Sequence, residues 1–211
     1  MKKTIIISSL FLMWAMFASA QNETDNRERF QFGLKAGGSY SNVYDAKGED
    51  FDADAKFGLT GGIFVAIPIG KYLGVQPELN ITQKGFKGNG TLLFMPYSFK
   101  RTTTFLEIPL LMAFKPSEFI TVLAGPQFSY LLSQRDEFSS SLVSTIQENE
   151  FDQDNIRKNL LGIACGLDIN LKSIVLGGRM SWDIMNNKGD GTSDTPRYKN
   201  LCTQVTIGYK F

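Results

Sequence analysis

LCTQVTIGYKF, residues 201–211, alternates strictly between two kinds of side chain. A period of two residues is the mark of a β-strand, because successive side chains of a strand point to opposite faces. One face suits lipid and the other is mostly polar or small, which predicts a strand in the wall of a membrane-spanning barrel. The first face holds Leu201, Val205, Ile207, Tyr209 and Phe211, and the second holds Cys202, Gln204, Thr206, Gly208 and Lys210.

The same alternation recurs along the chain from Phe30 onward. It indicates about eight runs that are each long enough to cross a bilayer when tilted. The runs are 30–41, 57–69, 72–84, 101–114, 119–131, 159–171, 174–185 and 201–211. We therefore expect an all-β fold, an eight-stranded antiparallel transmembrane β-barrel of up-and-down topology.

The expected connections alternate in length. Tight turns at 70–71, 115–118 and 172–173 alternate with long polar stretches near 42–56, 86–100, 132–158 and 186–200. Transmembrane barrels have short periplasmic turns and long outer loops, whereas a soluble β-sandwich has no reason to separate the two. An even number of strands then places both ends of the barrel domain on the periplasmic side.

Four prolines lie inside or at the ends of the expected strands: Pro68, Pro77, Pro109 and Pro126. Proline removes a ladder donor, and a closed barrel has no edge strand to accommodate it. We therefore expect bulges or strand ends at these positions.

The N-terminus has the pattern of a secretory signal. Lys2 and Lys3 precede an apolar stretch, residues 5–17, and Ala18-Ser19-Ala20 forms a cleavage site of the A-x-A type. The expected organisation is a cleaved signal peptide at 1–20, a polar periplasmic tail at 21–29 and an outer-membrane barrel domain at 30–211. Cys165 and Cys202 are expected to face opposite sides of the wall, where a disulfide cannot join them.

Charge and composition exclude several classes of function. Lys and Arg number 22 against 21 Asp and Glu, so no global field favours nucleic acid. The chain has no histidine, which removes the usual general base of serine and cysteine hydrolases. The carboxylates of residues 49–54 do not form a calcium loop, because Ala55 and Gly61 stand where a glycine and a bidentate acid are required. We expect no enzyme, cofactor or metal site.

Alternation places charges of both signs on the inner face: Lys35, Lys84, Arg179 and Lys210 against Glu78, Glu107, Asp168 and Asp183. An eight-stranded barrel is just wide enough to be filled by side chains, and charges in so narrow a space must pair. The hypothesis is that Arg179 or Lys35 bridges Glu78 and Glu107, which would plug the lumen. A catalytic pair of carboxylates, as in glycosidases, is disfavoured because the lumen has no room for a sugar.

The longest connection, near 132–158, has an apolar centre at Leu142, Val143 and Ile146. Two interpretations stay open. The three residues could form a contact site for another envelope protein, or the segment could be a solvated loop or a hairpin that extends the barrel above the membrane.

These segments together resemble the PorT-like family of small outer-membrane β-barrels. The resemblance covers the mature chain and is carried by QPEL (76–79) with QKG (83–85), LEIPLL (106–111), Gly125-Pro126 and the terminal GYKF (208–211). It implies an eight-stranded outer-membrane barrel. The founding members of the family look like helpers in protein secretion, a role that is tied to none of these motifs. The resemblance also implies that Tyr209 and Phe211 are part of a signal that the barrel-assembly machinery reads.

The sequence therefore predicts a non-enzymatic structural or accessory barrel of the outer membrane. Its expected partners are outer-membrane lipid and lipopolysaccharide, the assembly machinery during biogenesis and a further envelope protein. The alternative is a small passive channel or ligand-uptake barrel, which would need a less crowded lumen.

Overall fold

A computed structural model describes residues 26–44, 53–92, 95–140, 144–149, 157–187 and 198–211. These residues form a short 3-10 helix, η1 (Asn26–Glu28), and nine strands in one antiparallel sheet. The strands are β1 (Gln31–Tyr44), β2 (Ala53–Pro68), β3 (Leu73–Leu92), β4 (Met95–Phe114), β5 (Ile120–Ser140), β6 (Ser144–Asn149), β7 (Asn159–Leu171), β8 (Ile174–Asp183) and β9 (Lys199–Lys210).

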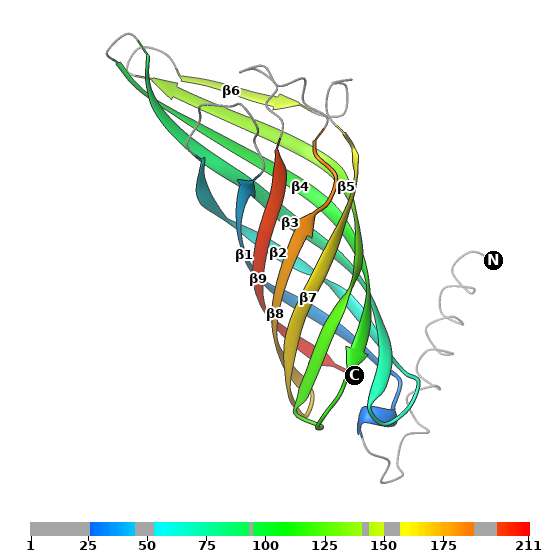
Figure 1. The fold of residues 1–211 in the computed structure, drawn as a ribbon. Helices are drawn as coiled ribbons and strands as arrows, with labels where there is room; N and C mark the ends of the chain where they lie inside the picture. Colours follow the sequence, from blue (N-terminus) through cyan, green and yellow to red (C-terminus); the bar gives the residue numbers. More distant parts are fainter. Residues whose placement is uncertain (1–25, 45–52, 93–94, 141–143, 150–156, 188–197) are drawn as a thin grey trace, which may run out of the picture.

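Eight of these strands close into a ring (Figure 1). The first and last strands pair, with Gly33 opposite Lys210 and Tyr44 opposite Lys199. β5 pairs with both β4 and β7, so β6 lies outside the ring. The predicted eight-stranded antiparallel barrel is confirmed.

Apolar side chains cover the outside of the wall along every strand of the ring. The alternation of burial is regular in β8, where Leu176 and Met180 are exposed and Val175 and Arg179 are buried. Exposed aromatic side chains lie toward both ends of the barrel wall. At the outer end, Tyr40 packs on Phe57 with ring centroids 4.7 Å apart. Such a belt is the surface that lipid tails require, and burying it in the bilayer is favourable.

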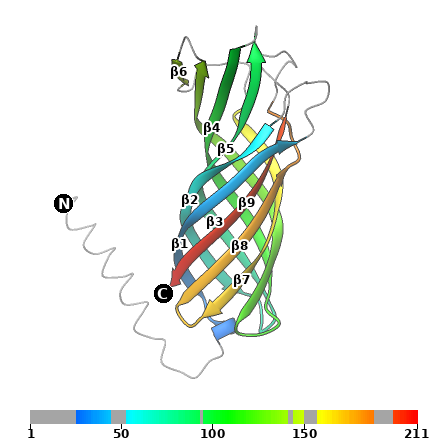
Figure 2. The ribbon, with the colours of Figure 1, turned by 90° about the vertical axis from the view of Figure 1, so that its left-hand side faces the viewer.

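The three tight turns lie at the end of the barrel that also holds η1 and the C-terminus, as Figures 1 and 2 show. At this end the chain passes between strands over residues 69–72, 115–119 and 172–173. Lys172 has a positive φ of 54°, which suits a two-residue hairpin turn. By the general rule for bacterial barrels this is the periplasmic end.

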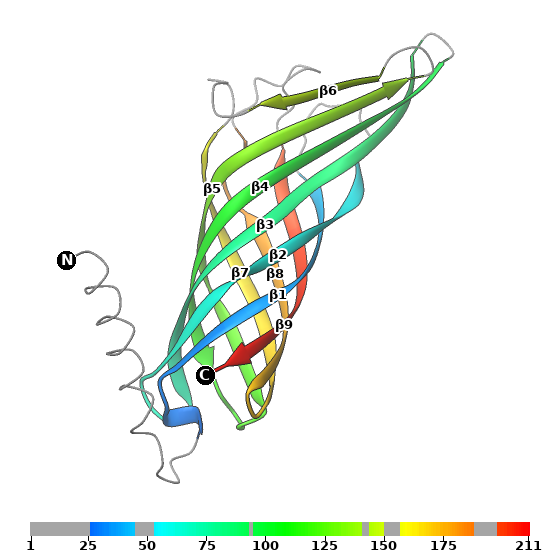
Figure 3. The same cartoon turned by 180° about the vertical axis from the view of Figure 1, so that it is seen from behind.

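The opposite end differs from the prediction. β3, β4 and β5 continue far beyond the ring, and β6 pairs with β5 from Gln134↔Asn149 to Ser139↔Ser144. The four strands form a sheet, here called the outer sheet, that leans away from the barrel axis (Figure 3). The loop expected at 86–100 is therefore wrong, because its described residues are largely strand. For 132–158, the pairing of β5 with β6 agrees with the interpretation as a hairpin that extends the barrel above the membrane.

The length of β5 shows how far the outer sheet projects. Its 21 residues span about 70 Å at about 3.3 Å per residue, whereas about 10 tilted residues cross the membrane. The remaining half lies outside the bilayer, where the outward face no longer has to be apolar. This is why the hydrophobic alternation fades there although the strands continue.

The expectation for the prolines is right at one of the four positions. Pro68 ends β2, as expected, but no register shift occurs at Pro77, Pro109 or Pro126 in the described pairings. Pairing between β3 and β4, for example, lapses after Pro77↔Leu110 and resumes in the same register at Asn80↔Glu107. Each of these three prolines thus interrupts the pairing with one neighbouring strand, but no extra residue is inserted and the register is kept.

Register shifts occur elsewhere, between Ala55 and Thr60 in β2 and between Thr104 and Phe105 in β4. The first lies opposite Gly85, whose φ is 151° and where a Cβ would come within 2.0 Å of the Arg101 carbonyl oxygen. Only glycine fits at this position. The bulge marks the level at which β3 leaves the ring and enters the outer sheet.

Candidate functional site

The interior of the barrel is the first candidate site, because it contains buried charges of both signs. All six residues of the predicted lumen network point inward and are at most 8% exposed: Lys35, Glu78, Lys84, Glu107, Arg179 and Asp183. Asp168 is 5% exposed, and Lys210, nearer the periplasmic end, is partly buried. The side chains divide into two clusters along the barrel.

The inner cluster is centred on Arg179 in β8, which forms ion pairs with two carboxylates. Its guanidinium donates to both oxygens of Asp168, at 2.7 and 3.0 Å, and to Glu78 at 3.1 Å. Lys35 forms a second ion pair with Glu78. Gln76 completes the cluster by donating to Glu78 at 2.9 Å and to Asp168 at 3.4 Å. Two cations thus face two anions, so the cluster is neutral overall.

Room for the Arg179 side chain comes from glycine on the neighbouring strand. Gly166 lies opposite Arg179 in the β7–β8 ladder. A Cβ at Gly166 would come within 2.5 Å of the Arg179 Cδ and 2.3 Å of the Gly178 carbonyl oxygen. The Arg179 side chain can therefore lie across the lumen only because residue 166 is a glycine and has no side chain.

The outer cluster is centred on Glu107 in β4, which is 1% exposed. Lys84 forms ion pairs with Glu107 at 2.8 Å and with Asp183 at 3.6 Å. Glu107 also accepts hydrogen bonds from Thr82, Gln127 and Gln204, at 2.8, 2.9 and 3.0 Å. Asn200 donates to Asp183 at 2.6 Å. Residues from five strands therefore meet at one level of the lumen.

The predicted bridge between Glu78 and Glu107 is wrong in its partners. Arg179 and Lys35 both contact Glu78, whereas the described ion pair of Glu107 is with Lys84. The reason is depth along the barrel, because Glu107 pairs in register with Asn80 rather than with Glu78. Alternation indicates which side chains enter the lumen but not which of them meet across it.

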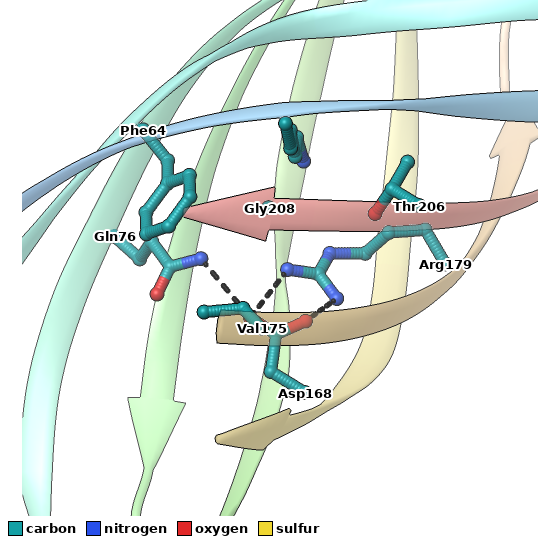
Figure 4. A pocket seen from close by; sticks show the side chains of 8 residues that line it. Phe64, Gln76, Asp168, Val175, Arg179, Thr206 and Gly208 are labelled. Carbon is teal, nitrogen blue, oxygen red and sulfur yellow. Dashed lines mark hydrogen bonds and ion pairs between the residues drawn. The ribbon is translucent and has the colours of Figure 1, made fainter. Parts of the chain in front are cut away.

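A cavity of about 190 Å³ lies beside the inner cluster (Figure 4). Phe64 and Val175 form its apolar side, and Gln76, Asp168 and Arg179 form its polar side. A second cavity of about 400 Å³, which includes space open to solvent, lies at the periplasmic end beside Lys115 and Lys210. The volume of the first also includes space open to solvent, so this cavity holds about one ordered water and is smaller than sites for small-molecule ligands, which start near 300 Å³.

The outer mouth contains a cation packed among aromatic rings. Arg101 donates to both oxygens of Asp136, at 2.8 and 2.9 Å. Its guanidinium lies 5.9 Å from the Phe86 ring centroid and 5.3 Å from that of Phe99. The Phe86 ring packs edge-on against Tyr198, with centroids 5.3 Å apart. This group lies where the ring ends and the outer sheet begins, and the sequence analysis did not single it out.

The other predicted site residues lie at the two ends of the molecule. Tyr209 and Phe211, the predicted assembly signal, are half-exposed on the outer wall, where Phe211 stacks on Phe32 with centroids 6.0 Å apart. Ile146 lies in β6 opposite Glu137, whereas Leu142 and Val143 lie outside the described residues, as does the expected signal peptide. Cys165 and Cys202 are both free thiols, as expected.

In the described part of the chain, no helix is long and apolar enough to cross a membrane, and no three potential metal ligands cluster.

A family model decides where the chain belongs. Residues 19–189 match the model described as outer membrane protein beta-barrel domain. The chain belongs to this family. It is therefore an outer-membrane β-barrel protein, and the family match agrees with the closed ring and its apolar belt.

Solved structures of small barrels are similar at low sequence identity. Ail, the attachment invasion locus protein of Yersinia pestis, is 16% identical, with 87% of this chain and 99% of Ail covered and a TM-score of 0.46. OprG from Pseudomonas aeruginosa is 14% identical over 87% of this chain and 97% of that chain, with a TM-score of 0.45. Neisserial surface protein A is 11% identical over 85% and 97%, with a TM-score of 0.46. Among curated protein sequences no significant match was found.

Proposed function

We propose that the protein is a closed, non-enzymatic barrel that serves as an accessory component of the outer membrane and binds through its outer sheet. The observation that carries the proposal is the filling of the lumen by two ion-pair clusters at successive depths. An open pathway for solutes would require these side chains to move apart, which would leave buried charges without partners.

The outer end supports the binding role. Arg101 and Asp136 occupy the mouth of the ring, while β3 to β6 continue beyond it (Figure 1). The outer parts of the hairpins β3–β4 and β5–β6 lie beyond the bilayer and are not needed to span it. A surface for another envelope component explains this length, and the resemblance to PorT-like barrels points to a helper role in secretion.

The absence of histidine from the whole sequence supports a non-enzymatic role. We also propose that Tyr209 and Phe211 are recognised by the barrel-assembly machinery, since both side chains are half-exposed at the end of the last strand.

The test of the closed lumen compares wild type with Glu78→Gln and Arg179→Met in planar bilayers. The wild type is expected to show no steady conductance, and the variants are expected to lose folding, seen as loss of heat-modifiable gel mobility. A small passive channel, the alternative, would give steady conductance in wild type and altered permeability in well-folded variants. That second result would refute the closed barrel.

The test of the binding role is in-cell photocrosslinking from Leu142 and Val143, followed by mass spectrometry. A discrete envelope protein in the product is expected and would identify the process that the barrel serves. A folded, surface-exposed protein that gives no product from either position would contradict binding through this end.

A further inference from the structure

The larger cavity, at the periplasmic end of the barrel, is here called the periplasmic cavity. Its volume of about 400 Å³ includes space open to solvent, and its enclosed part has room for about two or three waters. Gln76 and Asp168, which belong to the inner cluster, close it toward the lumen. Arg27 of η1, the short helix at this end of the barrel in Figure 2, also lines it. A ligand from the periplasm can therefore place only a small group inside.

Lys115, the residue after β4, is a buried cation in the wall of the periplasmic cavity. It is 6% exposed, and its ammonium donates to the backbone carbonyl of Arg27 at 3.0 Å. A Cβ at Gly74, on the neighbouring strand β3, would come within 3.4 Å of the Lys115 Nζ. The glycine leaves room for the lysine to turn inward, and η1 holds it there.

Lys210, at the end of β9, is the second lysine of this wall and is partly buried. Its ammonium donates to the Asn170 Oδ1 at 2.9 Å, and the Asn170 amide in turn donates to the Thr121 hydroxyl at 3.0 Å. No carboxylate lies within ion-pair distance of Lys210 among the described residues. An ammonium has three donors, so Lys210 has one neutral partner here and donors left for a ligand.

The charges that line the periplasmic cavity do not balance. The lining includes three cations and two acids: Arg27, Lys115, Lys210, Asp168 and Glu118. Both oxygens of Asp168 accept hydrogen bonds from Arg179 inside the neutral inner cluster. Glu118 is exposed on the turn after β4, and Glu28 of η1 is exposed and does not line the cavity. With Glu118 set against one cation, two positive charges remain in excess.

We infer that the periplasmic cavity binds the terminal phosphate of a soluble phosphate monoester, with Lys115 and Lys210 as its main contacts. A phosphate monoester carries a charge of about −1.5 to −2 at pH 7, which matches the excess, whereas a carboxylate would offset only half of it. Its oxygens accept charge-assisted hydrogen bonds from ammonium groups. The enclosed space admits the phosphate and leaves the rest of the compound in the periplasm. The site lies at the end opposite the outer sheet, so it goes beyond the binding role proposed above.

The experiment titrates the refolded full-length protein, in a non-ionic detergent at pH 8, with methyl phosphate and follows binding by calorimetry. Lys115→Gln and Lys210→Gln are each expected to weaken binding about tenfold, and the double variant about a hundredfold, because each removes one charge-assisted hydrogen bond. Lys210→Arg should retain binding, because the charge is kept. The matched control is the double variant Lys71→Gln and Lys172→Gln, which removes two charges from tight turns at the same end, outside the cavity, and should bind like wild type.

Two comparisons identify the group that is bound. Binding of methyl phosphate should weaken as pH falls from 8 to 5, because the phosphate gains a proton with a pKa of about 6. Acetate and phosphatidylglycerol, which carry a single charge, should compete poorly with methyl phosphate.

Three results would overturn the inference: no binding of methyl phosphate to wild type, undiminished binding to Lys210→Gln, or competition by phosphatidylglycerol as strong as that of methyl phosphate itself. Heat-modifiable mobility shows in each case that the variant is folded. Lys210 is only partly buried, so Lys210→Gln decides the test even where Lys115→Gln does not fold.

Discussion

Replacing Glu107 by Gln removes one charge from the outer cluster without changing the shape of the side chain. Lys84, whose side chain is 1% exposed, would then have Asp183 at 3.6 Å as its remaining carboxylate in the described lumen. Removing one partner of a buried ion pair costs about 3–5 kcal/mol because the other charge is left uncompensated. Because Asp183 still compensates part of the Lys84 charge, we expect the free energy of unfolding to fall by an amount near the lower limit, about 3 kcal/mol.

The assay is urea unfolding of the barrel in lipid vesicles, followed by tryptophan fluorescence. For a slope of about 2 kcal/mol per M, a loss of about 3 kcal/mol lowers the midpoint by about 1.5 M. Adding Lys84→Met to Glu107→Gln should recover at least half of the loss, because the second substitution removes the unpaired charge.

The matched control is Glu137→Gln, which makes the same change in an exposed pair. The side chains of Lys100 and Glu137 are 39% and 32% exposed, so water screens their interaction and no measurable shift is expected. Equal midpoints for wild type and Glu107→Gln would refute the reasoning, as would a double variant no more stable than Glu107→Gln alone.

Three further predictions concern packing, charge and accessibility. Gly166→Ala should destabilise the barrel, because the new Cβ would collide with Arg179, and should lower its heat-modification temperature. Gly178→Ala is the control and should leave that temperature unchanged, because its Cβ would meet its nearest atom at 4.0 Å. Equal effects of the two substitutions would contradict the packing argument. The Lys100 hydrogen bond holds the pKa of Glu137 below its ordinary value. The contribution of this exposed pair to stability, too small to shift the unfolding midpoint, is present above the unfolded pKa and is lost as pH falls through the folded pKa. Side-chain NMR should show that the Glu137 carboxyl titrates at a pKa below its ordinary value, and Lys100→Met should raise that pKa. Cys202, which is 0% exposed in the lumen, should react with thiol reagents only after unfolding; rapid labelling of the folded barrel would indicate an open lumen.

The outer sheet shows where pattern reading fails. The alternation of apolar and polar residues is strong only where one face meets lipid, and lipid meets only the lower half of β5. Above that level, β4 and β5 are held by cross-strand pairs such as Arg101 with Asp136, which have no apolar periodicity. The strands therefore continue through 86–100, where a loop was expected, and through 132–158, where a hairpin was one of two interpretations.

The sequence by itself determined the closed barrel, its eight spanning strands and the inward direction of residues such as Glu78, Lys84 and Glu107. It could do so because lipid imposes a period of two on every spanning strand, and that period is a local property of the chain. Only the tertiary structure decided that Arg179 joins Glu78 to Asp168 while Lys84 joins Glu107 to Asp183. Those partners come from strands far apart in sequence, and their meeting depends on the stagger between strands and on the space left at Gly166.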